Sequence, residues 1–200
     1  MFRVGIIGLG RIATTLEDEV GIPGFSITGA FNVLPETRVV AGCNRGEERR
    51  RKFGERWGVK ALYHDYREML EKEKLDIVAV ATQPPLHPEM VIAAAEAGVS
   101  GILCEKPMAL SLGECDAMLA ACEKSKVKLA INFSNRWSGQ HEAVRQLSNS
   151  GRWGPLLHIV ACSHGCKPTP EWEADTEGPL LHDAIHMLDL MRFFGGDVKA

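Results

Sequence analysis

A glycine pattern near the amino terminus has the spacing of a loop that binds a dinucleotide. Gly8-Leu9-Gly10-Arg11-Ile12-Ala13 matches G-x-G-x-x-A and directly follows the apolar run Arg3–Gly8. Glycines at these positions permit a tight turn and let backbone N–H groups approach a pyrophosphate. The chain has 20 glycines, so the match alone is weak, but its place directly after a strand favours a cofactor loop over a structural turn. We predict that the cofactor is contacted by Gly8, Gly10, Arg11 and Ile12.

The end of the second predicted strand bears on the choice between NAD and NADP. The acidic residue that would hold the ribose 2′-hydroxyl is absent, and Asn44-Arg45 stands in its place, followed by Arg49–Lys52. An amide followed by a guanidinium suits a 2′-phosphate better than a bare diol. We therefore expect Asn44 and Arg45 to contact a cofactor that is NADP or NAD, with NADP slightly favoured. The alternative is that the arginine run is only a solvated helix face.

Two further loops follow buried strands at the same edge of the predicted sheet. Thr82-Gln83-Pro84-Pro85-Leu86-His87 follows the strand Asp76–Thr82, and Glu105-Lys106-Pro107 follows Gly101–Cys104. Ligands of open parallel sheets bind at the carboxyl ends of the strands. Because a residue before proline is restricted to extended conformations, Pro107 gives Lys106 a fixed platform. The combination predicts that this lysine points toward the nicotinamide region, although a single lysine at a strand end is usually a surface charge.

A late helix carries two histidines one turn apart. His182-Asp183-Ala184-Ile185-His186 has the spacing of H-[DE]-x-x-H, in which two histidines bind zinc. Upstream, four possible ligands of the same parity share one face of a predicted strand: His158, Cys162, His164 and Cys166. A zinc-binding hydrolase that uses His182 and His186 is therefore one alternative function. The stronger interpretation is a polar sheet face that binds no metal.

Apolar runs and helical patterns alternate along the first two-thirds of the chain. The predicted strands are Arg3–Gly8, Arg38–Cys43, Ala61–His64, Asp76–Thr82, Gly101–Cys104 and Lys128–Phe133. The helical patterns between them are Arg45–Trp57, Pro88–Ala97 and Ser111–Ser125. In the last of these, Ser111 and Glu114 have the spacing of a capping box. This order predicts an α/β fold with a doubly wound parallel sheet and helices on both faces.

The segment Thr14–Pro35 interrupts the alternation. Charged residues at 17–19 and glycines at 21 and 24 delay the helix expected directly after the first strand. We predict a surface loop here, followed by a helix over Ile27–Leu34. A tolerated insertion and a substrate-covering loop are equally compatible with these residues.

The pattern changes again near residue 135. Asn135–Trp137 ends the sixth strand, and the next predicted elements are a helix over Gln140–Ser148, a strand over Leu156–His164 and a helix over Leu180–Phe194. We therefore place a dinucleotide-binding domain at 1–134 and the beginning of a second α/β domain at 135–200.

Composition and charge argue against several classes of protein. The 200 residues are 45% hydrophobic and 24% charged with a net charge of −3, which is typical of globular proteins and makes no electrostatic case for nucleic acid. No apolar run approaches the ~20 residues needed to cross a bilayer. The first residues lack the pattern of a signal peptide. The six cysteines are therefore expected to be reduced thiols in the cytoplasm.

Five segments occur in an order that resembles a known family. G-L-G-R-I-A, A-T-Q-P-P-L-H-P-E-M, A-A-A-E-A-G, L-C-E-K-P-M-A-L and L-L-H-D-A-I-H-M-L-D-L follow one another along essentially the whole chain. Together they are similar to the Gfo/Idh/MocA family of glucose–fructose oxidoreductase, inositol dehydrogenase and rhizopine-catabolism proteins. The resemblance implies an NAD(P)-binding Rossmann domain followed by a second α/β domain with a mainly antiparallel sheet. It also implies hydride transfer between the cofactor and a carbon of a sugar, inositol or related polyol.

The resemblance implies roles for individual residues. Lys106, in the segment that matches E-K-P, would contact both cofactor and substrate, with Glu105 beside it at the cofactor. The loop residues that would lie near the nicotinamide are Thr82, Pro84 and His87. At the junction of the domains, the residues that would contact substrate are Asn132, Arg136 and Trp137.

His186 matches the family's histidine that commonly acts as acid or base. Positions 182, 186 and 189, with 183 alongside, form a polar wedge on an otherwise apolar helix. Near the amino end of a helix the dipole disfavours imidazolium, which keeps a histidine able to accept a proton. Many members carry a carboxylate four residues before this histidine, where this chain has His182, with Asp183 next. Either His182 or Asp183 is a candidate partner of His186 at the catalytic and substrate site.

The length of the chain bears on whether the second domain is complete and on which functions are possible. Family members are typically much longer, so a chain of 200 residues is expected to hold a complete first domain and an unfinished second one. A non-catalytic NAD(P)-binding sensor or regulatory subunit is therefore a second alternative. The resemblance favours a small-molecule substrate and a homo-oligomer formed through the second domain, with neither nucleic acid nor a membrane as partner.

Overall fold

A computed structural model describes residues 1–162, 178 and 180–199. The chain forms two compact units, Met1–Ile131 and Asn132–Ala200, which we call unit 1 and unit 2. Unit 1 is a layered α/β structure, and the elements described in unit 2 are helical.

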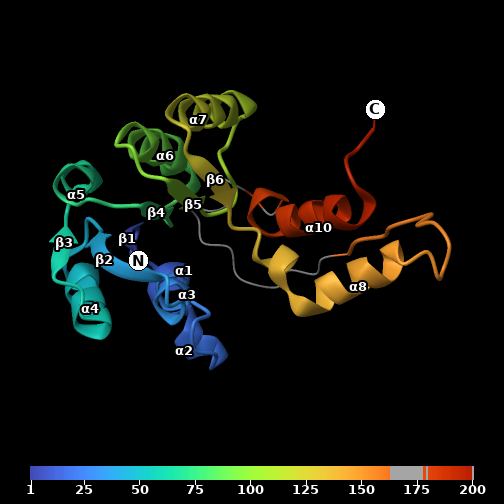
Figure 1. The fold of residues 1–200 in the computed structure, drawn as a ribbon, viewed down its shortest axis with the longest axis horizontal. Helices are drawn as coiled ribbons and strands as arrows, with labels where there is room; N and C mark the ends of the chain where they lie inside the picture. The colour runs from blue at the N-terminus through green and yellow to red at the C-terminus, as the bar shows by residue number, and fades with distance from the viewer. Residues whose placement is uncertain (163–177, 179, 200) are drawn as a thin grey trace. The chain divides into compact units, whose positions relative to one another are not determined.

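Unit 1 is built on a sheet of six parallel strands in the order β3-β2-β1-β4-β5-β6 (Figure 1). The strands are β1 Phe2–Ile7, β2 Thr37–Cys43, β3 Ala61–Tyr63, β4 Ile77–Val80, β5 Gly101–Cys104 and β6 Lys128–Ile131. The direction of winding reverses between β1 and β4, which is the doubly wound Rossmann arrangement. The predicted fold of the first part of the chain is therefore confirmed.

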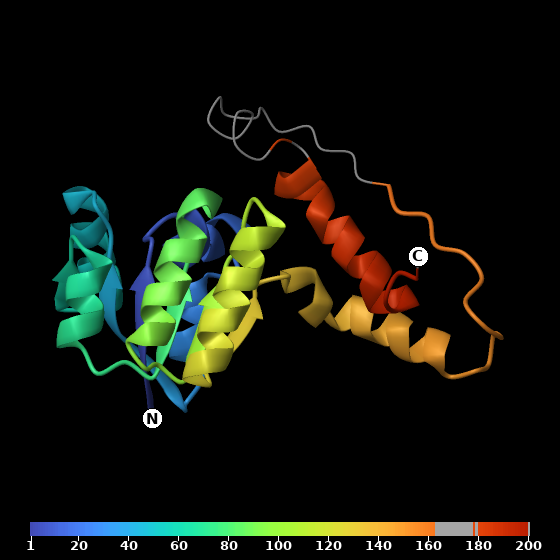
Figure 2. The same ribbon diagram turned by 90° about the horizontal axis from the view of Figure 1, so that it is seen from above.

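Helices cover both faces of this sheet (Figures 1 and 2). One face carries α5 Tyr66–Lys72, the short 3-10 helix η1 Pro84–Leu86, α6 His87–Glu96 and α7 Leu112–Ser125. The other face carries α1 Arg11–Thr14, α3 Ile27–Val33 and α4 Glu47–Trp57. Ser111 is the N-cap of α7: its Oγ accepts a hydrogen bond from Glu114 N (3.3 Å), which is one half of the predicted capping box, and donates one to the Glu114 carboxylate (2.9 Å).

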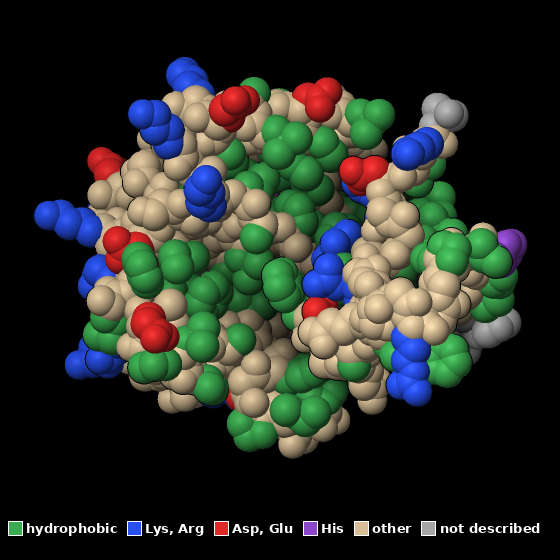
Figure 3. Space-filling model, turned by 45° about the vertical axis from the view of Figure 1, so that its right-hand side comes forward, with side chains coloured by type: hydrophobic (Ala, Val, Ile, Leu, Met, Phe, Trp, Pro, Cys, Tyr) green, Lys and Arg blue, Asp and Glu red, His purple; other side chains and the backbone are tan. Residues whose placement is uncertain are grey.

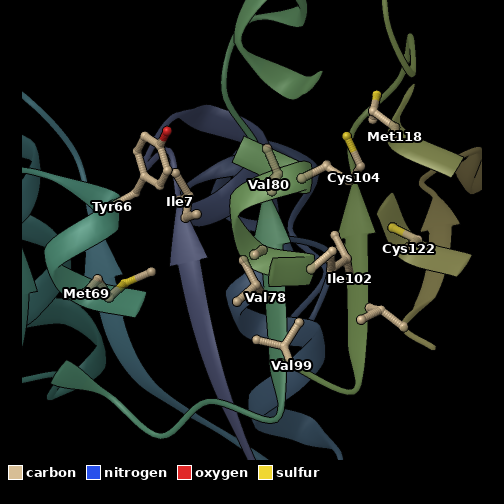
Figure 4. Close-up of a cluster of buried hydrophobic side chains, with 14 of the residues drawn as sticks. Ile7, Tyr66, Met69, Val78, Val80, Val99, Ile102, Cys104, Met118 and Cys122 are labelled. Carbon is tan, nitrogen blue, oxygen red and sulfur yellow. The ribbon is translucent and has the colours of Figure 1, made fainter. Parts of the chain in front are cut away.

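The core of unit 1 lies in two layers, one on each side of the sheet. Successive residues of β4 alternate between them: Val78 and Val80 belong to the layer shown in Figure 4, and Ala79 belongs to the other. All three are fully buried. A strand buried on both faces must be apolar throughout, and this explains the continuous apolar run at these positions.

The segment Thr14–Pro35 contains more helix than its sequence predicts. The predicted helix is confirmed as α3, but Leu16–Val20 forms the additional helix α2, so the predicted surface loop is wrong over these residues. Leu16 is buried, and the neighbouring carboxylates of Glu17 and Asp18 pair with Arg56 of α4. Long-range burial and charge pairing therefore stabilise a helix that local sequence signals disfavour.

Unit 2 contains η2 Ser134–Trp137, α8 Gly139–Asn149, the π-helical turn η3 Leu180–Ala184 and α10 Ile185–Gly195. The two predicted helices are confirmed. The predicted strand Leu156–His164 is wrong over residues 156–162, which have no regular structure, and residues 163 and 164 lie outside the described part. A strand needs a neighbour to satisfy its backbone groups, and the described residues of unit 2 contain no strand, so the implied antiparallel sheet has no element among them.

Charged side chains of both signs are spread over the face of the molecule shown in Figure 3. No helix in the described residues is long and apolar enough to cross a membrane. Figure 3 shows Lys and Arg side chains at many separate places, with Asp and Glu among them.

Candidate cofactor site and catalytic residues

Backbone hydrogen bonds at the carboxyl edge of the sheet join the loops that follow four neighbouring strands. The three bonds are Gly8 N to Cys43 O (2.9 Å), Ala81 N to Ile7 O (2.7 Å) and Glu105 N to Val80 O (2.9 Å). They continue the strand pairing past the ends of β2, β1, β4 and β5. The loops that carry the sequence motifs therefore lie side by side, where open α/β sheets bind ligands.

The two motif glycines differ in what would surround a side chain at each position. Gly8 has φ +92°, and a Cβ atom there would lie 2.5 Å from the carbonyl oxygen of Ala81, so the close approach of β4 excludes any side chain. A Cβ atom on Gly10 would meet nothing within 4 Å. The space over Gly10 leaves room for a pyrophosphate against the backbone, and the loop therefore fits a dinucleotide.

Asn44 and Arg50 hold the end of β2 against the glycine loop. The Asn44 Oδ1 atom accepts a hydrogen bond from Leu9 N (3.4 Å). The Arg50 Nη1 atom donates to the carbonyl oxygens of Asn44 (2.6 Å) and Arg45 (2.9 Å), while the Arg45 side chain is exposed. Sequence reasoning missed Arg50, whose only signal was membership of the basic run Arg49–Lys52.

A hollow of about 310 Å³ lies beside the glycine loop and is lined by four cations. These are Arg11, Arg49, Lys52 and Arg56. Three of them pair with carboxylates: Arg11 with Glu19, Lys52 with Glu48, and Arg56 with Glu17 and Asp18. Arg49 forms no ion pair with any described residue. Its charge is thus available to an anionic ligand next to the loop.

Several residues of the segment after β4 are buried or half-buried. Pro84 is buried in η1, and Thr82 is half-buried, with its hydroxyl 3.4 Å from Met90 Sδ. His87 is fully buried, and its ring nitrogens lie 3.1 Å from the carbonyl oxygen of Thr82 and 2.9 Å from that of Pro107. The imidazole therefore contacts the backbone of two loops and has no exposed surface.

Lys106 lies between two anchored residues. Glu105, before it, is 8% exposed, and its N–H is bound to Val80 O. Pro107, after it, is buried, follows a cis peptide bond and has its carbonyl at His87. Lys106 itself is half-buried. The backbone on both sides of the lysine is thus held by β4 and by α6.

In unit 2, Arg136 is engaged with α10. Its Nε atom lies 2.8 Å from both carboxylate oxygens of Asp189, and its guanidinium stacks over the Phe193 ring at 5.3 Å. The Asp189 side chain is only 10% exposed. Asp189 was recognised in the sequence as part of the polar wedge, but its pairing with Arg136 spans 53 positions and had no sequence signal.

The predicted catalytic residues of unit 2 lie on and just after a π-helical turn. His182 and Asp183 belong to η3, with Nε2 and Oδ1 3.8 Å apart. His186 follows in the first turn of α10, is half-buried, and packs edge-on against Phe133 with ring centroids 6.2 Å apart. Of the other predicted substrate residues, Asn132 is half-buried and Trp137 is 83% exposed.

The possible metal ligands and the buried thiols complete the set of candidate residues. Among the residues with described positions, no group of three or more His, Cys, Asp or Glu side chains is placed to hold a metal ion. Two of the proposed zinc ligands, His164 and Cys166, lie outside the described residues. Burial raises the pKa of the Cys43 thiol to about 12 and also raises that of Cys104, so both are protonated, packing side chains at neutral pH.

Comparison with known proteins gives a consistent result. The family model for Gfo/Idh/MocA, described as an oxidoreductase family with an NAD-binding Rossmann fold, matches residues 2–133. D-apiose dehydrogenase from Paraburkholderia graminis is 36% identical over 176 residues, which cover 84% of this chain and 46% of that protein. Myo-inositol 2-dehydrogenase from Thermotoga maritima is 29% identical over 98% of this chain and 55% of its own length.

A solved structure of similar fold supports the same grouping. The crystal structure of a probable dehydrogenase from Thermotoga maritima aligns with a TM-score of 0.80 and 26% identity, over 98% of this chain and 56% of that one. The chain thus spans about half the length of the relatives it matches.

Proposed function

Because the chain belongs to the Gfo/Idh/MocA oxidoreductase family, we propose that it binds a nicotinamide dinucleotide through unit 1 and serves hydride transfer to or from a sugar, inositol or related polyol. The observation that carries this proposal is the glycine loop. Gly8 is pressed against the end of β4, Gly10 faces open space, and Lys106 follows the next strand of the same edge. The named relatives act on D-apiose and myo-inositol, which indicates the class of substrate to try first.

The cofactor assignment follows the geometry of the loop. The nicotinamide ring of the bound cofactor is the hydride donor or acceptor. Gly8, Gly10, Arg11 and Ile12 form the pyrophosphate loop, and the Thr82–Pro84 backbone and Glu105 border the adjacent part of the sheet edge. Lys106 orients or polarises the reacting oxygen. In unit 2, His186 accepts or donates the hydroxyl proton, with His182 or Asp183 as its partner and Asn132 and Trp137 as substrate contacts.

NADP is the cofactor that we favour. Asn44 takes the position of the usual ribose-binding carboxylate, and its side chain is occupied by Leu9 N. Positive charge is supplied by the exposed Arg45 and by Arg49, which lies beside the glycine loop and pairs with no carboxylate in the described part of the chain. Replacing Asn44 by Asp adds negative charge where the 2′-phosphate would lie. We expect N44D to lower the ratio of kcat/KM for NADP to that for NAD by about tenfold or more, equivalent to ~1.4 kcal/mol.

Two arginines of one helix provide a matched test of the hollow. Arg49 lines it, whereas Arg51 is paired with Glu48 and Glu55. We expect R49A to weaken NADP binding severalfold and R51A to leave it unchanged. Equal effects of the two substitutions, or an unchanged cofactor ratio in N44D, would contradict the preference for NADP.

The function as a whole is tested by binding and turnover. Calorimetric titration with NADPH and NADH measures binding to the chain, and a screen of inositols, pentoses, hexoses and sugar acids measures cofactor-linked oxidation. We expect cofactor binding and turnover of at least one polyol, with turnover lost and binding retained in K106A and H186A. Tight binding with no turnover would support a cofactor-binding sensor, and absence of binding would reject the proposal.

A further inference from the structure

His87 connects two loops of the cofactor edge through its imidazole ring. Its Nε2 atom lies 3.1 Å from the carbonyl oxygen of Thr82, at the start of the loop after β4. Its Nδ1 atom lies 2.9 Å from the carbonyl oxygen of Pro107, directly after Lys106. Carbonyl oxygens only accept hydrogen bonds, so the ring nitrogen that binds each of them must carry a hydrogen. A neutral imidazole has one N–H and donates to one carbonyl at a time, whereas the imidazolium has two and donates to both.

The burial of His87 excludes direct contact with a ligand. Its exposed fraction is 0%, so in this structure the ring touches neither a cofactor at the sheet edge nor a substrate. Any effect of the residue on the reaction therefore passes through the groups that surround its ring, and these include the two backbone segments.

We propose that His87 is a positioning residue, which sets the separation between the Thr82 loop and the Glu105–Pro107 turn and thereby fixes the backbone of Lys106. This inference rests on the proposed function. Lys106 is bracketed by two contacts: Glu105 N binds Val80 O on one side, and Pro107 O lies at His87 on the other. The second of these contacts depends on a side chain. His87 is therefore a point at which a single substitution loosens the lysine backbone.

Three substitutions separate the two contacts. The amide nitrogen of Asn can occupy the place of Nδ1, and that of Gln the place of Nε2. H87N thus retains a donor toward Pro107, H87Q retains one toward Thr82, and H87L retains neither. V91A is the matched control, because Val91 is also fully buried and lies one turn further along the same helix, α6.

The first measurement does not depend on activity. Hydrogen–deuterium exchange of the cofactor-free chain reports on amides of residues 83–87 and 105–110. We expect H87L to accelerate exchange in both segments about tenfold, H87N to protect mainly the second, and V91A to produce no selective change there. Unchanged exchange of both loops in H87L, or the same pattern in V91A, would overturn the proposal.

The second measurement separates positioning from folding stability. A small displacement of a reacting group can cost about 100-fold in rate. In the NAD(P)-linked assay we expect H87L to lower kcat by this order with KM for the cofactor within about threefold, and H87N to recover more of kcat than H87Q. V91A should lower the Tm but keep the wild-type kcat. If the wild-type chain shows no turnover, the proposed function fails, while the exchange experiment still decides the role of His87.

Discussion

At the scale of single residues, Gly8 and Gly10 belong to one motif but differ in backbone conformation and in the atoms that surround them. Gly8 has a left-handed backbone conformation and a neighbouring carbonyl oxygen where a Cβ atom would lie. Gly10 has an ordinary φ of −85° and open space above it. The first glycine is required by the folded chain itself, and the second is required only when a ligand approaches the backbone.

This difference predicts opposite effects of alanine at the two positions. We expect G8A to lower the free energy of unfolding by about 1–3 kcal/mol, the cost of a strained backbone and a close contact. G10A should change it by less than about 0.5 kcal/mol, as at a surface position, but should weaken NADP binding at least tenfold. Urea unfolding and cofactor titration measure the two quantities. A destabilised G10A that still binds NADP normally would contradict this assignment.

At the scale of elements, charge pairing joins the segment between β1 and β2 to the rest of unit 1. Glu17 of α2 accepts hydrogen bonds from Ser26, the N-cap residue of α3, and from Arg56 of α4. Partial burial tends to raise the pKa of Glu17, but the hydrogen bonds from Ser26 and Arg56 outweigh it and hold the pKa below its usual value of 4.5. The carboxylate of Glu17 therefore joins α2 to two other helices, α3 and α4.

The lowered pKa of Glu17 predicts an acid-sensitive contribution to stability. Because the folded pKa lies below the unfolded value, the stabilisation is complete above about pH 4.5 and is lost as the pH falls through the folded pKa. We expect E17Q to be less stable at pH 7 and to show a flatter loss of stability between pH 5 and pH 3. Glu19 is exposed and pairs with Arg11, so E19Q is the control, and an equal flattening in both variants would contradict the prediction.

The anchoring of α10 gives a second prediction at this scale. Arg136 binds Asp189, whose side chain is 10% exposed, whereas Arg145 pairs with Glu142, whose side chain is 35% exposed. We expect R136M to lower the opening free energy of α10 by about 1–2 kcal/mol and R145M by about 0.5 kcal/mol or less. Native-state hydrogen exchange of α10 amides measures both. Equal effects would show that the stacking of the two arginines on Phe193, rather than the ion pair, anchors the helix.

At the scale of the whole molecule, the two units differ in how much apolar surface they bury. Both hydrophobic clusters lie in unit 1, and Leu190 is the one buried hydrophobic residue among those described in unit 2. Apolar side chains such as Leu157 (89% exposed) and Val160 (73% exposed) instead face solvent. Because burial of apolar surface supplies most of the folding free energy, the stabilities of the two units should differ strongly.

This asymmetry predicts separate unfolding of the units. We expect unit 2 amides to exchange freely at urea concentrations that leave unit 1 folded, and cofactor at 100 times its Kd to stabilise unit 1 alone by about 2.7 kcal/mol. Trp57 is the only tryptophan of unit 1, so its fluorescence in a variant with the other tryptophans replaced by Phe follows that unit. A single transition that the cofactor shifts equally in both units would contradict this expectation.

The elements that the sequence predicts correctly are those whose signals lie within a few neighbouring residues. The apolar strand Val78–Val80 and the glycine after β1 carry their signals within a few residues, so the sheet was recovered to within two residues at each strand end. Helix α2 is stabilised by an ion pair with Arg56, which is far along the chain. The charged residues of this helix, taken without that partner, predict a loop. The strand expected at 156–162 failed for a related reason, since alternation of side chains does not provide a partner strand.

The candidate site likewise combines local features, which the sequence predicts, with tertiary contacts, which it does not. Residue types and spacing predict Gly8, Gly10 and Lys106 as candidate site residues, because tight turns and strand ends are local features. They could not predict the tertiary contacts of other candidate residues: Arg136 binds Asp189, and His87 contacts two backbone carbonyls. Arg50 was missed because only its contacts distinguish it from its basic neighbours.

The sequence by itself determined the Rossmann order of unit 1, the dinucleotide loop and the family, because each rests on periodicity or on motifs a few residues long. Only the tertiary structure decided that Leu9 N binds Asn44, that Arg49 lines the hollow without an ion pair to any described residue, and that His87 contacts two loops. The physical reason is that burial and hydrogen-bond partners are properties of groups brought together by folding. The type of a residue determines which hydrogen bonds its side chain can donate or accept, and folding determines which partner lies within reach.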